Sequence, residues 1–326
     1  MAAFLSDTFS TSNDFTPVVL GMDGGGTKTE VLLTDLQGKT LSSFIGGPTN
    51  LAAVPEKEAL DNLEEALSAV FMQSPKVRVV QAVIGMAGID TLSDEARFRP
   101  FADATLESFG IKKYQLFNDS AVALANGSDA ANALILIAGT GSICYGHNST
   151  GKTARAGGMD YLLADEGSGY WIGRKVLRAV VRAHDGRGLP TVMTELVLTH
   201  FGISKVSQLK QKVYQPQLSK MKIAELAKVW EQAVVRNDEI ALIIQKQIID
   251  KLALLVEAVA RSLALTDKPF DLVLAGSIAL LPVVQPLLRA RLETTFPSLS
   301  ICIPETTPVN GAIKLALAAV KNEKLV

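Results

Sequence analysis

Two carboxylates, each placed directly after a short apolar run, are the residues of this sequence best placed for chemistry. Asp23 follows the run 18–22, and Asp119 comes soon after the run 114–117. A carboxylate at the end of a strand can hold a hydrated Mg²⁺ ion or accept a proton from a hydroxyl. Each also has a plainer explanation, because Asp23 could be a solvated hairpin residue and Asp119 could cap a helix that begins at Ser120.

A glycine-rich turn follows Asp23 and leads into a second apolar run at 31–34. Two β-rich runs joined by glycines are typical of a hairpin. Glycine permits a positive φ and lets the backbone approach a ligand closely, and the N–H groups of such a turn can form a nest for phosphate. We therefore predict a phosphate-binding turn, with hydroxyls from its two threonines, made of Gly24, Gly25, Gly26, Thr27, Lys28 and Thr29.

The same pattern returns in the middle of the chain. Gly139, Thr140, Gly141 and Ser142 lie between the apolar runs 133–137 and 143–145. Two glycine-threonine turns, each opening one half of the chain, indicate two similar domains that face one another. A nucleotide's phosphates would then be held from both sides.

The segment 146–153 matches the P-loop pattern, but its context is wrong. A P-loop follows a buried strand and opens a helix, whereas residues 154–158 are poor helix formers. Residues 148–151 have the composition of a hairpin turn. We therefore predict a surface hairpin here and no phosphate site.

Two further segments combine glycine with polar side chains. In the loop 157–169, Asp165 and Glu166 could face a ligand, or could simply be favourable charges near a helix N-terminus. Gly276 and Ser277 follow an apolar run, where they could approach a base or ribose or form a plain turn between strand and helix.

The elements that must position these residues follow from periodicity, and they predict an α/β fold with mixed sheets. Strands are expected at 18–22, 31–34, 40–45, 77–85, 114–117, 133–137, 143–145, 270–274 and 299–303. Helices are expected at 55–71, 93–109, 170–183, 190–199, 222–235, 238–265, 282–294 and 309–320.

Composition limits the classes of function. A chain of 326 residues predicts two domains, and a net charge of -1 argues against a nucleic-acid or membrane surface. Cys144 and Cys302 lie in apolar runs without metal-binding spacing, which predicts reduced core thiols. Residues 1–16 lack the features of a signal peptide and predict a disordered tail, and the charges within 238–265 exclude a membrane span. We expect a cytoplasmic protein.

Together the motifs resemble the N-acetylglucosamine kinase branch of the BadF/BadG/BcrA/BcrD ATPase family, within the superfold shared by actin, hexokinase and heat-shock-chaperone ATPases. The resemblance extends over residues 18–320. It implies two ribonuclease-H-like, actin-like ATPase domains with a cleft for nucleotide and sugar between them. The first would comprise 17–119 with the C-terminal helix 309–326, and the second would comprise 120–308 with a helical insertion.

The resemblance also implies roles for individual residues, with ATP and Mg²⁺ as cofactors. Asp119 stands at the position of the catalytic base, and Asp23 at that of the metal ligand. Both glycine turns would bind phosphate, and Gly276 with Ser277 would contact adenosine. The sugar would be bound by Asn50, Asp119, Gly158, Met159, Asp160 and Asp165.

One departure from the family pattern concerns the sugar. The family has Gly-Gly-Trp-Gly where this chain has Gly157, Gly158, Met159 and Asp160. If Asp160 faces the pocket it would favour a cationic amine, and if it faces water its charge matters little. The expected activity is phosphorylation of the C6 hydroxyl of N-acetylglucosamine, with glucosamine or N-acetylmuramic acid as alternative acceptors.

Two other classes of function stay open. A partner-activating ATPase is one, but such proteins need cysteine ligands for an iron–sulfur cluster. A sugar-responsive regulator is the other, but no DNA-binding segment precedes residue 18. We expect a small-molecule sugar as the partner, no nucleic acid and no membrane, and we leave a homodimer as an open alternative.

Overall fold

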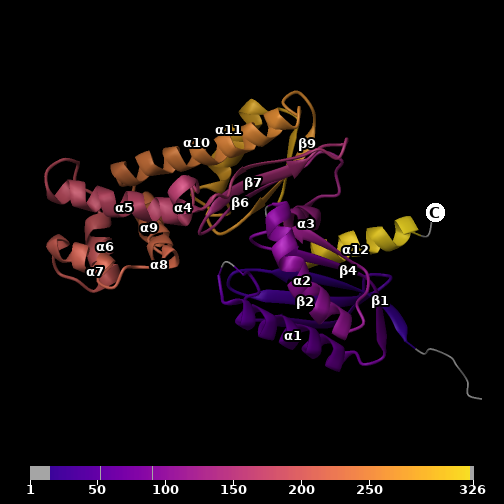
Figure 1. The fold of residues 1–326 in the computed structure, drawn as a ribbon. Coiled ribbons are helices and arrows are strands. Elements are labelled where there is room, and N and C mark those ends of the chain that lie inside the picture. Colours follow the sequence, from indigo (N-terminus) through magenta and orange to yellow (C-terminus); the bar gives the residue numbers. More distant parts are fainter. Residues whose placement is uncertain (1–14, 52, 90, 324–326) are drawn as a thin grey trace, which may run out of the picture. The chain divides into compact units, whose positions relative to one another are not determined.

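The computed structural model describes residues 15–51, 53–89 and 91–323 (Figure 1). The expected disordered tail lies outside the described residues, apart from Phe15 and Thr16, and Thr16 already begins the first strand. The chain divides into two compact units. Unit 1 runs to Asn126 and resumes at Thr307, and unit 2 runs from Gly127 to Thr306. Unit 1 thus extends past the boundary expected at residue 119.

Unit 1 is built on one mixed sheet whose first three strands form an antiparallel meander. Among the described residues its strand order is β3-β2-β1-β4-β5, with β4 and β5 running parallel to β1. The elements are β1 (Thr16–Gly24), β2 (Thr29–Asp35), β3 (Thr40–Gly46), α1 (Glu56–Gln73), β4 (Val77–Met86), α2 (Leu92–Ser108), β5 (Tyr114–Asn118), α3 (Asp119–Gly127) and α12 (Val309–Glu323).

Helices cover both faces of this sheet. Val18, Leu20 and Met22 of β1 pack in a cluster with residues of α1 and α2, because alternate residues of a strand share a face. Val19 points the other way, into a cluster with residues of α3 and α12. The last helix, α12, is yellow in Figure 1 and packs on β1 and β4.

Unit 2 repeats the same sheet and adds helices. Within the part of the chain described, the order β8-β7-β6-β9-β10 mirrors that of unit 1, with β9 parallel to β6 and β10 parallel to β9. Its elements are β6 (Ala133–Ala138), β7 (Ser142–His147), β8 (Thr153–Gly157), α4 (Asp160–Leu163), α5 (Gly169–His184), α6 (Met193–Phe201), a 3₁₀ turn (Val206–Gln208), α7 (Leu209–Tyr214), α8 (Lys220–Ala224), α9 (Ala227–Val235), α10 (Glu239–Ser262), β9 (Phe270–Ala275), α11 (Gln285–Thr295) and β10 (Leu299–Cys302).

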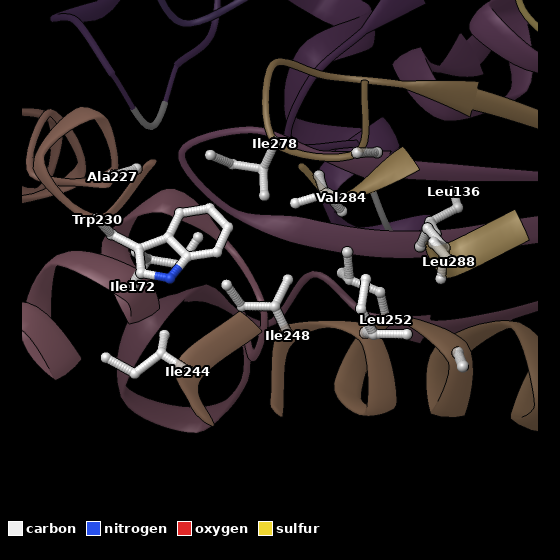
Figure 2. Packing of buried hydrophobic residues seen from close by; sticks show 14 of the residues in the cluster. Leu136, Ile172, Ala227, Trp230, Ile244, Ile248, Leu252, Ile278, Val284 and Leu288 are labelled. Carbon is white, nitrogen blue, oxygen red and sulfur yellow. The ribbon is translucent and has the colours of Figure 1, made fainter. Parts of the chain in front are cut away.

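The core of unit 2 joins the sheet to these helices. Figure 2 shows Ile248 and Leu252 of α10 projecting from their helix into this core. Trp230 of α9 is fully buried, and its indole N–H donates to the Ala241 carbonyl at 2.9 Å, which satisfies the one polar atom of that side chain. This packing fixes the helical insertion to the sheet that carries the second glycine turn.

The structure corrects two predicted helices. The helix expected at 222–235 is two helices, α8 and α9, because the backbone bonds of Leu226 and Lys228 reach back only three residues and break the helical ladder. The helix expected at 190–199 begins only at Met193, since Asp238 accepts from the Thr191 hydroxyl and the Val192 N–H and thereby holds the chain just before it.

Candidate active site

The two predicted carboxylates lie at one edge of the unit 1 sheet. Asp23 of β1 and Phe117 of β5 are both level with Gly85, on either side of β4. Asp119 follows two residues later, so both carboxylates lie at the carboxyl ends of parallel strands. That edge is where open α/β sheets bind ligands.

The electrostatics of Asp23 confirm that charge is concentrated at this edge. Burial, the neighbouring charge of Asp119 and that of Glu30 together raise the pKa of Asp23 from 3.8 to about 7, against an opposing effect of Lys28. A carboxyl group that titrates near neutrality at a strand end is a candidate functional group.

Glu30 belongs to the same cluster and was not singled out by its sequence context. It pairs with Asp23 across the β1–β2 ladder. Its Oε1 accepts from the Thr307 hydroxyl at 2.9 Å, while its buried Oε2 has no hydrogen-bond partner and lies 3.6 Å from the Lys28 Nζ. With the hairpin assumed, pairing of its two strands across the glycine turn would have placed Glu30 opposite Asp23.

These side chains fit a hydrated Mg²⁺ ion and not a fully protein-ligated metal. Among the described residues no group of three or more His, Cys, Asp or Glu side chains could hold a metal ion. Mg²⁺, however, commonly keeps several waters and uses one or two carboxylates together with substrate phosphates. The Glu30 Oε2, which has no hydrogen-bond partner, and the raised pKa of Asp23 both fit an edge that can take up a further positive charge.

The first glycine turn owes its glycines to close packing and not to backbone conformation. Gly24, Gly25 and Gly26 do not adopt positive φ, contrary to the reason expected for them. A Cβ on Gly24 would lie 2.5 Å from the Thr49 Oγ1, and one on Gly25 would lie 3.0 Å from the Lys28 carbonyl oxygen. The turn is therefore packed tightly on its inner side.

The outer side of this turn is accessible, with one exception among the predicted residues. Gly26, Thr27 and Lys28 are exposed, as a phosphate-binding turn requires. Thr29 is instead fully buried, and its hydroxyl is 2.8 Å from that of Thr49. Its side chain holds the turn to the following loop, so the expectation that it contacts phosphate does not fit.

Asn50, a predicted site residue, lies beside the first turn. Its N–H donates to the Gly25 carbonyl at 3.3 Å, and its Oδ1 would lie 3.0 Å from a Cβ on Gly88. It lines a hollow of about 80 Å³, which Arg97 also lines. No local pattern marks Arg97, because it reaches this hollow from the second turn of α2.

The helix that begins at Asp119 is capped by its neighbour. The Ser120 N–H donates to the Asn118 Oδ1 at 2.9 Å, the bond that an N-cap residue makes to the second helical residue. The same N–H also lies 2.8 Å from the Asp119 Oδ1. Since Asn118 already satisfies this donor, the capping explanation does not require Asp119.

In unit 2 the second glycine turn borders a pocket. Gly139, Thr140 and Ser277 all line a cavity of about 260 Å³, together with residues of α8 and α9. The structure thus brings together residues of two motifs that lie far apart in the sequence. Glu225, Lys228 and Glu231 also line it and were not singled out by their sequence context.

Gly276 is the residue that joins these two motifs. It has a φ of 88°, and a Cβ there would lie 2.4 Å from the Ala138 carbonyl oxygen. Only glycine tolerates both conditions. The strand β9 can therefore end against the start of the second turn, where Ile278 donates to the Ala138 carbonyl at 2.8 Å.

The 158–166 loop is tied to the second turn by Asp165. This carboxylate is buried, and its Oδ1 accepts from the Ser142 N–H at 3.0 Å. A Cβ on Gly141 would lie 2.9 Å from the same oxygen, which explains the glycine. The Asp165 Oδ2 accepts from the Lys220 Nζ at 2.8 Å. The partners of Asp165 in this structure are thus protein groups, although a sugar hydroxyl was expected.

Asp160 lies at the solvent-exposed end of this loop and is paired. Its side chain is 67% exposed, and its Oδ1 accepts from the Lys220 Nζ at 2.5 Å. Met159 is also exposed, at 60%. Lys220 was not foreseen, because it reaches the loop from α8 and nothing near Asp160 in sequence indicates a cation.

The remaining predictions concern the P-loop-like segment, the two cysteines and membrane spans. The P-loop-like segment is a hairpin between β7 and β8, closed by the Asn148 N–H donating to the Lys152 carbonyl at 3.0 Å. Cys144 and Cys302 are both free, and burial raises the pKa of the Cys144 thiol far above its ordinary range. Among the described residues, helices long and apolar enough to cross a membrane are absent.

The motifs and the fold agree with known proteins. The chain belongs to the BadF/BadG/BcrA/BcrD ATPase family, whose model matches residues 20–316. It is 30% identical over 302 residues to an N-acetylmuramic acid/N-acetylglucosamine kinase from Clostridium acetobutylicum, which covers 91% of this chain and 97% of that protein. It is also 30% identical to an N-acetyl-D-glucosamine kinase from Dictyostelium discoideum, over 93% of this chain and 99% of that protein.

A solved structure has the same fold. A Chromobacterium violaceum protein, provisionally assigned as an N-acetylglucosamine kinase, matches with a TM-score of 0.69 at 24% identity. The match covers 92% of this chain and 98% of that one. At this level of identity the likeness concerns the α/β fold with its pair of five-stranded sheets.

Proposed function

We propose that this protein is an ATP-dependent kinase that transfers a phosphoryl group to the C6 hydroxyl of an amino sugar, with N-acetylglucosamine as the acceptor. Two relatives that are 30% identical over more than nine-tenths of this chain are named as kinases of this class. The structural observation that carries the proposal is the placement of Asp23 and Asp119 at one sheet edge, beside an exposed glycine turn.

Asp119 is the proposed general base. It would accept the proton of the C6 hydroxyl as the sugar oxygen forms a bond to the γ-phosphorus and the bond to the β-phosphate oxygen breaks. An ordinary Asp is ionised at pH 7 and can take this role. The start of α3 is compatible with this role, because Asn118 also accepts from the Ser120 N–H and can cap the helix.

Asp23 is the proposed ligand of Mg²⁺, with Glu30 behind it. When bound, Mg²⁺ supplies positive charge that offsets the charge of the transferred phosphoryl group. The backbone of Gly24, Gly25 and Gly26, with Thr27 and Lys28, is proposed to hold the phosphates at this edge. Neutralising the cluster would also lower the raised pKa of Asp23 and so make its carboxylate available.

Unit 2 provides the proposed nucleotide half of the site. Gly139, Thr140, Gly141 and Ser142 offer a second phosphate-binding turn, and Gly276 with Ser277 borders the pocket where adenosine would lie. Within unit 2, the 158–166 loop is the proposed contributor to acceptor binding, and within unit 1 it is Asn50. Asp165 would act by shaping that loop, given its burial and its bond to the Ser142 N–H.

The acceptor is N-acetylglucosamine in this proposal because Asp160 is paired with Lys220. A free carboxylate in the loop would favour the ammonium group of glucosamine, whereas one paired with a lysine attracts it less. Both 30% identical relatives are named for N-acetylated sugars.

A panel of acceptors tests the proposal. ATP, Mg²⁺ and the purified protein are incubated with N-acetylglucosamine, glucosamine, N-acetylmuramic acid or glucose, and the sugar phosphates are identified by mass spectrometry. We expect the highest kcat/KM with N-acetylglucosamine and the phosphate at C6. ATP hydrolysis without any sugar phosphate would instead favour the partner-activating ATPase, and absence of turnover would contradict both.

A further inference from the structure

Lys220 binds two carboxylates of one loop at the same time. Its Nζ donates to the Asp160 Oδ1 at 2.5 Å and to the Asp165 Oδ2 at 2.8 Å. Both aspartates have positive φ, at 63° and 67°, which is uncommon for residues other than glycine. Backbone strain of this kind persists only where surrounding contacts hold it in place, and it gathers at functional sites.

The helix that carries Lys220 is fixed by very close packing. A Cβ on Gly173 of α5 would lie 2.0 Å from the Ile223 carbonyl oxygen of α8. The N-terminus of α8 is capped by Ser219, whose hydroxyl accepts from the Lys222 N–H at 3.3 Å. Lys220 is the first residue of this helix, so its position relative to the loop is set by the backbone of α5.

The loop that Lys220 holds is also attached to the second glycine turn. The Asp165 carboxylate accepts from the Ser142 N–H at 3.0 Å, and the Gly158 N–H donates to the Ser142 carbonyl at 2.9 Å. If the phosphates of a nucleotide bind at this turn, the sugar that accepts the phosphoryl group would therefore lie close to the 158–166 loop.

We propose that Lys220 is a specificity-determining positioning residue, which offsets the charge of Asp160 and so limits the attraction of the 158–166 loop for a cationic sugar. The inference rests on the proposed function and names the part of the acceptor that is read, its C2 substituent. Asp165 is buried against Ser142 and Lys220, whereas Asp160 is exposed. Asp160 is therefore the accessible carboxylate whose charge Lys220 offsets.

The ionisation of the pair is consistent with this role. The hydrogen bond from Lys220 lowers the pKa of Asp160 below its ordinary value. Burial would lower the pKa of Lys220, but its bonds to Asp160 and Asp165 outweigh burial and raise that pKa. Asp160 and Lys220 therefore both stay charged near neutral pH, and Lys220 offsets part of the negative charge of the loop.

The test uses opposite changes of charge at the same pair. In Lys220→Met the Asp160 carboxylate loses its partner, and the ratio of kcat/KM for glucosamine to that for N-acetylglucosamine should rise by up to about fivefold, the range of one partly exposed ion pair. In Asp160→Asn the Lys220 ammonium loses a partner, and the same ratio should fall. The double variant should return close to the wild-type ratio.

A matched control lies two residues away. Lys222 of α8 is more exposed and pairs with Glu225, the residue after the helix, at 2.8 Å, so Lys222→Met should leave the ratio unchanged. Thermal unfolding of each variant reports whether the substitution also lowers stability. Lys220→Arg should retain the wild-type ratio of kcat/KM values, because it keeps the positive charge.

One outcome would contradict the role of Lys220 alone, and another would contradict the proposed kinase function. If Lys220→Met and Asp160→Asn change both sugars equally, or if the double variant does not restore the ratio, Lys220 is only structural and the inference is wrong. If the wild-type protein phosphorylates neither sugar, the proposed kinase function fails, and the specificity role fails with it.

Discussion

Asn118 and Asp119 occupy adjacent positions at the start of α3. Asn118 accepts from the Ser120 N–H and caps the helix, while Asp119 lies near enough to Asp23 to help raise its pKa. In sequence the two explanations for Asp119, cap or base, could not be separated. In the structure the Ser120 N–H lies within bonding distance of both the Asn118 Oδ1 and the Asp119 Oδ1, so the role of Asp119 as the base stays a prediction.

We predict that Asp119→Asn retains the fold and sugar binding but lowers kcat by about 10²–10⁴-fold, the usual contribution of a positioned base. Asparagine keeps the size and the hydrogen bond of the aspartate but cannot accept the proton. The measurements are kcat, the Kd for sugar and the melting temperature. A near-normal kcat would remove Asp119 from the mechanism.

Asp23 should make stability depend on pH. Between 3.8 and about 7 the folded protein holds a proton on Asp23 that the unfolded chain has released. Rising pH therefore favours unfolding across that window, and the loss is complete above pH 7. Asp23→Asn should be more stable than the wild type at pH 8, by at most about 4 kcal/mol, since one pKa unit corresponds to about 1.4 kcal/mol.

Urea unfolding at several pH values, with and without Mg²⁺, measures this effect. Mg²⁺ should stabilise the wild type at pH 8 and have little effect on Asp23→Asn, because the ion needs the ionised carboxylate. A stability difference between the two proteins that stays constant from pH 4 to 8 would show that Asp23 has an ordinary pKa.

At the scale of the element, the strands and the long helices could be predicted from apolar runs and periodicity. The short helices of the insertion could not. The break between α8 and α9 depends on three-residue hydrogen bonds at Leu226 and Lys228 and on contact with Gly173 of α5. None of these features changes the apolar pattern of 222–235, which is why one helix was expected there.

The first turn provides a prediction at this scale. Gly24→Ala should cost about 1–3 kcal/mol of unfolding free energy, because its Cβ would lie 2.5 Å from the Thr49 Oγ1 in a buried site. Gly26→Ala is the control, since its Cβ would be 3.3 Å from that of Ala53 on the exposed side. Equal losses in urea unfolding would mean that the inner packing of the turn is not what requires glycine.

The hairpin whose sequence matches the P-loop pattern provides a second prediction at this scale. The Lys152 Nζ donates to the Ser262 carbonyl at 2.6 Å at the surface, so Lys152→Ala should leave kcat and the KM for ATP nearly unchanged. Asp23→Ala should lose Mg²⁺-dependent turnover. The reverse order of these two effects in a steady-state assay would place the phosphate site at the hairpin.

At the scale of the whole molecule, the recurrence of a glycine turn in each half predicted the repeated sheet. Both sheets of the described chain have a meander of three antiparallel strands with two parallel strands beside it. Contacts over long sequence separations were beyond reach. Lys220 meets Asp160 and Asp165 across 60 and 55 residues, and no local pattern encodes that meeting. Candidate site residues could thus be proposed from motifs, whereas Lys220, which holds the 158–166 loop, could not.

The kinase assignment is tested most directly by the balance between nucleotide consumed and sugar phosphate formed. ATP, Mg²⁺ and N-acetylglucosamine are incubated with the protein, and ADP and N-acetylglucosamine 6-phosphate are quantified in the same sample. We predict equal amounts of the two products and no sugar phosphate from 6-deoxy-N-acetylglucosamine, which lacks the accepting hydroxyl. ADP formed without sugar phosphate, or a phosphorylated product from the 6-deoxy sugar, would contradict phosphoryl transfer to C6.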